Sequence, residues 1–548
     1  MSSTTRTVTK AAGIMMAAIF VSRILGLVRE MVIANQFGGG GDVSAYVVAF
    51  NLPDILYFLL SSGALSSAFI PVFTEYITKG QDDEAWKVFS ILGTFIFIVL
   101  GSIVILCEIF TRQIMPLVAP GFVQYPALLE QTIVLTRILL PCQLFFFIGG
   151  LIIATLYSRQ HFLAPALGPI IYNVGIISGG MLLGSRFGTA GLTWGALIGA
   201  FLGNFLLQVI AVRRFGVKFK PSLNLRHPGV VKVGKLALPV LLGLSLPYVD
   251  VYINRWFATF LQEGAAAALN YANRLMQMPL GVFAQAAAVA LFPTLAAQAA
   301  RKQMDELKWS INFGIRGILL LTVPSSVLMM VLATPIVTAL FQHGKFNAAN
   351  AAAASSALIF YSIGIAGWSA QAVITRGFYA LQETVVPVVA GTVMTLIFIP
   401  MNWLFMKPLG HDGLALATSV AAMLNMIVLF ELLRRRLGGL NGSLIVRSLI
   451  KVTVSSGVAG AVAWGILQVI SGHMEMDRPL HALIGVFGAA IPAVLVYMGM
   501  VTLLRVDEAH EVWRLVSARL GHRPPAQAMI EAAPETISAA SDDEAASP

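Results

Sequence analysis

Long, uninterrupted apolar segments are the feature that most restricts how this chain can fold. The segment SILGTFIFIVLGSIVILCEIF at 90–110 is long enough to cross the hydrocarbon core of a membrane as a helix. It lacks the alternating pattern of a membrane β-barrel strand. Only 11% of the 548 residues are charged, less than half of the roughly 25% usual in soluble domains. The sequence therefore predicts an all-α polytopic membrane protein and excludes a soluble enzyme or a disordered chain.

Fourteen such segments divide the chain, each bounded by charged residues, glycine or proline. We expect helices at 11–37, 43–77, 86–110, 127–157, 163–184, 190–214, 229–257, 265–298, 309–335, 349–378, 384–406, 411–436, 444–471 and 480–505. The remaining residues, 506–548, are too poor in apolar side chains to fold alone, so we expect a disordered cytoplasmic tail.

Lysine and arginine residues predict the orientation of these helices, because short cytoplasmic loops are enriched in both. With the N-terminus inside, 24 of the 36 fall on the cytoplasmic side, five in outer loops and seven within helices. We therefore expect both termini in the cytoplasm. The net charge of +10 follows from this distribution and does not indicate nucleic-acid binding.

An internal repeat organises the chain. Shifting the sequence by 222 residues aligns Pro71 with Pro293, and YSRQHFLAP (157–165) with YALQETVVP (379–387). Because each repeat holds six helices, an even number, both have the same orientation and form two parallel lobes, an arrangement typical of transporters. The predicted parts are a first lobe at 1–220, a second lobe at 221–440, two additional helices at 441–505 and the tail at 506–548.

Three of the seven arginines within helices lie near mid-membrane depth, namely Arg23, Arg29 and Arg274. A charge at that depth is costly and marks a functional site by default, and guanidinium groups bind phosphate through paired hydrogen bonds. The three residues therefore indicate an anionic substrate, although pairing with Glu30 or Asp54 would give them a purely structural role. A polar stripe at helical spacing accompanies Arg274 and consists of Asn270, Asn273, Arg274 and Gln277.

The other four arginines within helices have simpler explanations. Arg316 and Arg376 lie close enough to cytoplasmic helix ends to extend their side chains to water. Arg255 lies near an outer helix end, and Arg137 lies close to Pro141, whose ring frees a backbone carbonyl. We expect structural roles for these four.

No catalytic or metal-binding pattern accompanies the arginines. Cys107 and Cys142 lie within apolar runs, and the eight histidines show no ligand spacing. We therefore expect a protein without enzymatic activity, cofactor or metal.

Several motifs resemble the MurJ (MviN) family of lipid II flippases, within the multidrug/oligosaccharidyl-lipid/polysaccharide exporter superfamily. They include SRILGLVRE (22–30), GALSSAFIPVFTEY (63–76), YANRLMQMPLGVF (271–283) and GFYALQETVVP (377–387), and occur in both halves. The resemblance implies a bacterial cytoplasmic-membrane protein. Its implied substrate is lipid II, the undecaprenyl-diphosphate-linked disaccharide-pentapeptide moved outward for peptidoglycan synthesis and cell shape. It also implies that Arg23, Arg29 and Arg274 meet the diphosphate, and that the helices of 441–505 form a groove for the lipid tail.

The sequence departs from the family at several charged positions. Ser44 lies where many members have Asp, and Asn51 lies where they have a Lys in the cavity. Tyr57 replaces an Arg, Ser62 replaces a Glu, and Gln277 replaces an acidic residue. We expect Asn51, with Asn270, Asn273 and Gln277, to form the polar lining of the cavity.

Two other functions stay open at this point. One is a flippase for another polyprenyl-linked glycan; a cationic-drug exporter should carry acidic residues at mid-depth instead. The other is a membrane scaffold that binds cell-wall synthesis proteins through its tail. Deleting 506–548 separates the alternatives, because a scaffold would fail and a flippase would largely survive.

Overall fold

The computed structural model describes residues 3–60, 64–244 and 249–509. These residues are helical, as predicted, and contain no β-strand. The first half forms α1 (Ser3–Phe37), α2 (Gly41–Ala49), α3 (Asn51–Leu60), α4 (Ala64–Thr78), α5 (Asp82–Val118), η1 (Pro120–Gln124), α6 (Pro126–Leu139), α7 (Cys142–Ser158), α8 (Leu163–Phe187), α9 (Ala190–Gly199), the π-helix η2 (Ala200–Leu206) and α10 (Leu207–Arg213). The second half forms α11 (Pro228–Leu244), α12 (Val249–Ala258), α13 (Ala265–Pro279), the π-helix η3 (Leu280–Ala284), α14 (Gln285–Ala300), α15 (Met304–Val331), α16 (Ala333–Phe341), α17 (Ala348–Ile363), α18 (Ile365–Ala380), α19 (Val385–Arg436), α20 (Gly442–Ser471) and α21 (Pro479–Leu503).

Helices long and apolar enough to cross a membrane number nine in the described part of the chain, or ten if the bent pair α17–α18 is one span. This number is compatible with fourteen predicted spans. The 52-residue α19 contains two of them, separated at Gly410, where φ is +57°. Three other predicted spans also correspond to described helices. The span 11–37 corresponds to α1, which carries three charges in its second half. The span 43–77 corresponds to α2–α4, and the span 229–257 to α11–α12.

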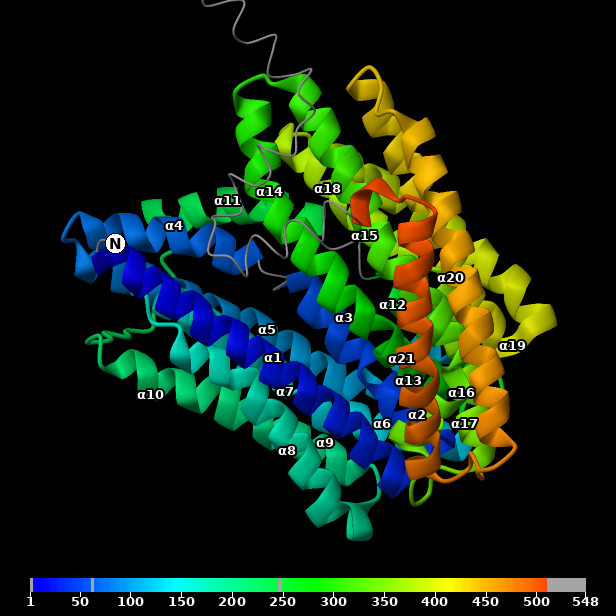
Figure 1. The fold of residues 1–548 in the computed structure, drawn as a ribbon. Coiled ribbons are helices and arrows are strands. Elements are labelled where there is room, and N and C mark those ends of the chain that lie inside the picture. Colours follow the sequence, from blue (N-terminus) through cyan, green and yellow to red (C-terminus); the bar gives the residue numbers. More distant parts are fainter. Residues whose placement is uncertain (1–2, 61–63, 245–248, 510–548) are drawn as a thin grey trace, which may run out of the picture.

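The backbone repeats with the sequence. Residues with left-handed φ recur 222 positions apart, as Gln160 (57°) and Gln382 (62°), and as Gly188 (59°) and Gly410 (57°). Both pairs follow equivalent helices, so the turns as well as the helices are duplicated. Two six-helix lobes with α20 and α21 added to the second therefore make up the fold (Figure 1). The residue boundaries given above for the lobes stay predictions.

The lobes meet at one end of the molecule, which we call the closed end; it carries residues 38–41, 119–125, 259–264 and 342–347. Tyr271 donates a hydrogen bond to the carbonyl of Gly38 (2.8 Å), and the amide of Lys345 donates to the carbonyl of Asn35 (2.8 Å). A single hydrophobic cluster joins side chains of both lobes there, including Ile33 and Phe341. Toward the opposite end, one cluster is built on the first lobe together with Val230 and Val233 of α11, and another is built on the second lobe.

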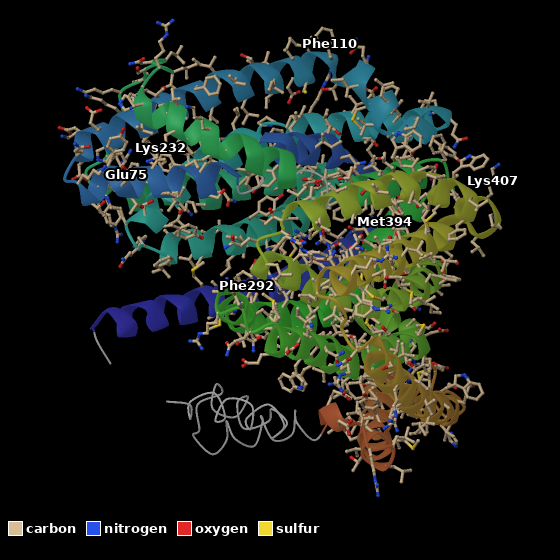
Figure 2. The ribbon with its side chains drawn as sticks, turned by 90° about the horizontal axis from the view of Figure 1, so that it is seen from above. Glu75, Phe110, Lys232, Phe292, Met394 and Lys407 are labelled. Atoms are coloured by element: carbon tan, nitrogen blue, oxygen red, sulfur yellow. The ribbon has the colours of Figure 1, made fainter. Side chains whose placement is uncertain are left out.

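The predicted helix 229–257 contacts both lobes through its two parts. α11 packs against α4 of the first lobe, where Lys232 and Glu75 form an ion pair of 2.6 Å (Figure 2). α12 packs against α19 of the second lobe. The two parts of this predicted helix therefore connect the lobes through side-chain packing as well as through the chain itself.

The additional helices lie along the second lobe. α20 packs on α15 and α21 on α16 and α20, and Figure 1 shows the pair running side by side. Tyr497 of α21 donates a hydrogen bond of 2.5 Å to the carbonyl of Leu320 in α15. Many of their outward side chains, such as Trp464 and Leu495, are exposed apolar groups.

Candidate functional site

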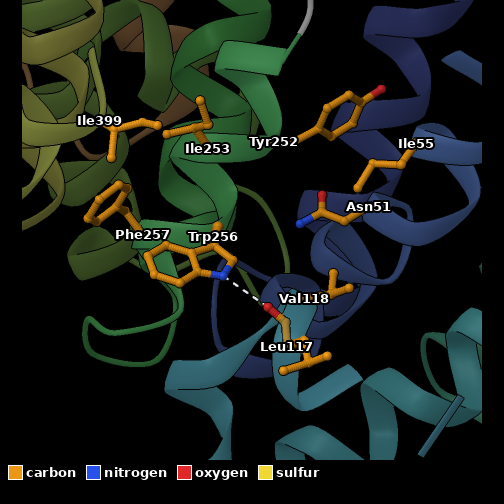
Figure 3. A pocket seen from close by; sticks show the side chains of 9 residues that line it. All are labelled: Asn51, Ile55, Leu117, Val118, Tyr252, Ile253, Trp256, Phe257 and Ile399. Carbon is orange, nitrogen blue, oxygen red and sulfur yellow. Dashed lines mark hydrogen bonds between the residues drawn. The ribbon is translucent and has the colours of Figure 1, made fainter. Parts of the chain in front are cut away.

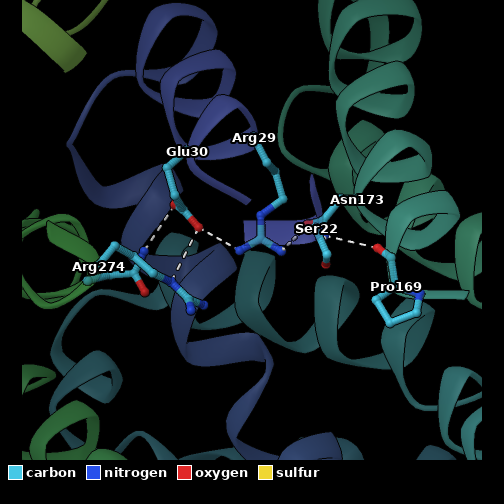
Figure 4. A network of polar contacts seen from close by, with 7 residues as sticks. Ser22, Arg29, Glu30, Pro169, Asn173 and Arg274 are labelled. Carbon is cyan, nitrogen blue, oxygen red and sulfur yellow. Dashed lines mark hydrogen bonds and ion pairs between the residues drawn. The ribbon is translucent and has the colours of Figure 1, made fainter. Parts of the chain in front are cut away.

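A buried carboxylate between two arginines lies where the lobes meet (Figure 4). Glu30 of α1 is 3% exposed and accepts a 2.6 Å hydrogen bond from Arg29. Consecutive helical residues point about 100° apart, so Arg29 turns away from Glu30's other partners and donates to Asn173 of α8 (3.1 Å). Arg29 is therefore fixed within the first lobe by two partners.

The second lobe completes this cluster through α13. Arg274 lies 3.5 Å from a carboxylate oxygen of Glu30, and Asn270 donates to the other oxygen at 3.3 Å. Arg274 is 45% exposed, whereas the Glu30 side chain is 4% exposed. Two guanidinium groups thus share one carboxylate, and the more accessible of the two belongs to the second lobe.

Arg23 lies apart from this cluster, toward the opposite end of α1. Its exposed guanidinium rests on η3, and a Cβ built on Gly281 would lie 2.0 Å from Nη1 of Arg23. No hydrogen bond or ion pair joins Arg23 to any residue in the described part of the chain. Its charge is therefore available to a ligand.

A second polar contact between the lobes lies nearer the closed end. Arg255 of α12 donates to Asn51 (3.2 Å) and lies 3.4 Å from a carboxylate oxygen of Asp54 in α3. Asn51 also lines an apolar pocket of about 390 Å³ between the lobes, with Tyr252 and Trp256 among its walls (Figure 3). The sequence did not indicate these partners of Arg255, because Asn51 and Asp54 lie about 200 positions away in the other lobe.

The predicted polar lining divides into three groups in the structure. Asn270 joins the Glu30 cluster, and Asn51 joins Arg255. Asn273 and Gln277 instead bond to each other at 2.7 Å. Of the three arginines expected at mid-depth, Arg29 and Arg274 therefore pair with Glu30, as the structural alternative allowed, and Arg23 pairs with neither Glu30 nor Asp54. Arg255 is the arginine that pairs with Asp54.

The departures from the family pattern have local explanations in the described part of the chain. Ser44 accepts a hydrogen bond from the amide of Ala267 across the lobes (3.2 Å). Tyr57 packs edge-on against Phe146 and Phe147. Ser62 lies outside the described residues.

Two further arginines differ in their surroundings. Arg376 stacks on the rings of Phe292 and Tyr379, 5.5 and 5.8 Å from their centroids, near a helix end as expected. Arg316 does not reach water as expected: it is 11% exposed and forms an ion pair with Glu508, itself 2% exposed. In the described part of the chain no group of three His, Cys, Asp or Glu side chains could hold a metal ion.

Two helical lobes with arginine–carboxylate pairs at their junction define a two-lobed membrane transporter. The sequence model described as "Lipid II flippase MurJ" matches residues 33–478. The chain belongs to this family, and with its apolar helices it is a multi-pass inner-membrane protein.

Relatives and solved structures agree with the family. A probable lipid II flippase MurJ of Vibrio cholerae is 30% identical, covering 90% of this chain and 96% of that protein. A lipid II flippase MurJ of Burkholderia cenocepacia is 29% identical over 76% of this chain and 82% of its own length.

Among structures, "Lipid II flippase MurJ, inward closed conformation" matches with a TM-score of 0.74 and 25% identity, covering 90% of this chain and 99% of that one. An inward-facing multidrug resistance MATE family transporter shares the fold, with a TM-score of 0.63, 17% identity, and coverage of 77% of this chain and 96% of its own.

Proposed function

We propose that this protein moves lipid II from the inner to the outer leaflet of the bacterial inner membrane by alternating access. The observation that carries the proposal is the meeting of Arg29 and Arg274, from opposite lobes, at Glu30. A site shared by two lobes changes its geometry whenever the lobes move. An anion bound there therefore influences their movement directly.

The diphosphate of lipid II suits this site chemically. Glu30 already occupies the place of an anion between two guanidinium groups. Arg274 is half exposed, so its remaining donors can reach a phosphate oxygen, and Arg23 offers a second charge that has no hydrogen-bond or ion-pair partner among the described residues. Guanidinium–phosphate hydrogen bonds are charge-assisted and about twice as strong as neutral ones.

Orientation follows from the charge distribution. We infer that the closed end faces outward and that both termini lie in the cytoplasm, because 24 of 36 lysines and arginines then lie inside. On this reading the hydrophobic cluster shared by the two lobes lies on the outer side of the membrane. The exposed apolar side chains of α20 and α21 would guide the polyprenyl tail, with membrane lipid as their other neighbour.

Transport of this kind needs no catalytic residue and no cofactor. The substrate crosses unchanged. At each step, only the set of side chains that contact the diphosphate changes. The side chains named above supply binding and positioning only. Cell-wall synthesis proteins would be partners through substrate supply and use.

Binding and growth test the proposal together. Arg29→Ala and Arg274→Ala should each weaken binding of radiolabelled lipid II to the purified chain by roughly tenfold or more, the loss expected for charged hydrogen bonds. Each of Arg23→Ala, Arg29→Ala and Arg274→Ala should fail to support cells depleted of their own flippase. Arg112→Ala is the matched control, because that exposed arginine pairs only with Glu130 among the described residues. A fully active triple variant would contradict the assignment.

A further inference from the structure

Arg255 lies closer to the closed end than the Glu30 cluster does. It precedes the last residue of α12, Ala258, by three positions, or about 5 Å of helix rise. Arg274 follows the first residue of α13, Ala265, by nine positions, or about 13 Å. Arginines are therefore arranged at successive depths, with Arg255 nearest the closed end.

The contacts of Arg255 leave most of its donors unused. Nη1 alone reaches both Asn51 (3.2 Å) and Asp54 (3.4 Å). Nε and Nη2 have no hydrogen bond to any residue within 3–60, 64–244 and 249–509. The side chains of Arg255 and Asp54 are 18% and 36% exposed. A loosely paired guanidinium with free donors can accept a second anion without losing its place.

This pair and the Glu30 cluster belong to one electrostatic environment. Arg255 and Arg274 lie on α12 and α13, which follow one another in the chain and are in contact. In both clusters the arginine of the second lobe faces a carboxylate of the first lobe, so parting the lobes at the closed end separates both pairs. Two guanidinium groups of the second lobe would then lack counter-ions unless a ligand supplied negative charge.

We propose that Arg255 is a further residue that contacts the diphosphate, on the outward side of Arg29 and Arg274, with Asp54 as its counter-ion in the empty protein. The inference rests on the proposed function and deepens it. The diphosphate compensates the charges that are exposed when the closed end opens. Opening is therefore favoured with substrate bound and disfavoured without it, because a ligand shifts an equilibrium only by binding one state better.

A simpler role would be that the Arg255–Asp54 pair merely locks the lobes together. The two roles differ in what the carboxylate does. In a lock, Asp54 and Arg255 contribute equally, and removing either opens the closed end to the same extent. In our proposal Asp54 competes with the substrate, so removing it exposes an anion site.

The test uses the full chain reconstituted in vesicles that contain lipid II. Arg255→Ala should slow lipid II movement at least about tenfold, the loss expected for a charge-assisted hydrogen bond, and Arg255→Lys should recover part of it. Asp54→Asn should slow movement less than Arg255→Ala does. It should also strengthen binding of inorganic pyrophosphate, the probe for the exposed site, severalfold. Arg112→Ala serves as the control outside the site.

Each outcome distinguishes a lock between the lobes from a diphosphate-binding role of Arg255. Equal losses for Arg255→Ala and Asp54→Asn, with unchanged pyrophosphate binding, would establish a lock and overturn the proposal. So would wild-type movement by Arg255→Ala. If the alanine variant fails to fold, Arg255→Gln can replace it, because glutamine keeps a donor for Asn51. This variant should slow lipid II movement to the same extent. A wild-type protein that moves no lipid II would instead overturn the proposed function itself.

Discussion

Single side chains at the lobe junction could be anticipated only in part. Depth within apolar helices singled out Arg23, Arg29 and Arg274, because a charge there demands compensation or a ligand. Their partners could not be derived in the same way. Glu30 and Arg274 are 244 positions apart in sequence, and their contact depends on how α1 and α13 approach each other.

Neutralising Glu30 tests whether that carboxylate compensates the arginines. Glu30→Gln should lower the free energy of unfolding by about 1–3 kcal/mol, because two guanidinium groups lose their shared anion. Added lipid II should then raise the thermal unfolding temperature more in the variant than in wild type. Equal ligand stabilisation of both proteins would show that Glu30 does not occupy the anion position.

The close contact between Arg23 and Gly281 gives a second prediction at this scale. Gly281→Ala should displace the Arg23 guanidinium, since the added Cβ would lie 2.0 Å from Nη1, and slow lipid II movement severalfold. Gly317→Ala is the matched control, because a Cβ there would meet no atom within 4 Å beyond its chain neighbours and the backbone of its own helix turn. Equal rates for the two variants in vesicles would show that the position of Arg23 is unimportant.

At the scale of helices, the repeat made most of the fold predictable. Apolar length located the spans, and recurring Pro, Gly and Gln residues located equivalent turns. Breaks within spans, such as the end of α2 before Asn51, escaped prediction because packing between lobes decides them. The start of the tail also differs from expectation. Val506 is 1% and Glu508 2% exposed, although apolar content alone suggested a free segment from 506.

The contacts of Glu508 predict where the chain can be shortened. Glu508 pairs with Arg316 of α15 and accepts a 3.0 Å hydrogen bond from Ser448 of α20. Ending the chain at 505 should cost about 3–5 kcal/mol of stability, because it removes one partner of a buried ion pair. Ending it at 509 should leave folding and transport largely intact. The two truncations can be compared by thermal unfolding and by growth of dependent cells.

Glu508→Gln separates this ion pair from other effects of truncation. The variant should lose a large part of the stability that the chain ending at 505 loses. A stable Glu508→Gln protein, or equal stability of the two truncated chains, would contradict an anchoring role for Glu508.

For the whole molecule, the two lobes share a hydrophobic cluster and polar contacts at the closed end, while toward the opposite end α11 alone joins the cluster of the first lobe and the second lobe has a cluster of its own. Parting the lobes at the closed end breaks Arg274–Glu30 and Arg255–Asp54 together. In the mechanism that we propose, this arrangement links diphosphate binding to the movement of entire lobes. Sequence alone could predict two lobes and a cationic site between them. It could not predict which end was closed, because that depends on contacts between residues over 200 positions apart, such as Tyr271 and Gly38.

The most direct test of a lipid II flippase is the accessibility of lipid II in the outer leaflet of cells whose only flippase is this chain. We expect accessible lipid II with the wild-type protein. When Arg29 and Arg274 are both replaced by alanine, we expect lipid II to accumulate in the inner leaflet with little outer exposure. Outer-leaflet lipid II that stays at the wild-type level in that double variant, or is absent with the wild-type protein, would contradict the proposed function.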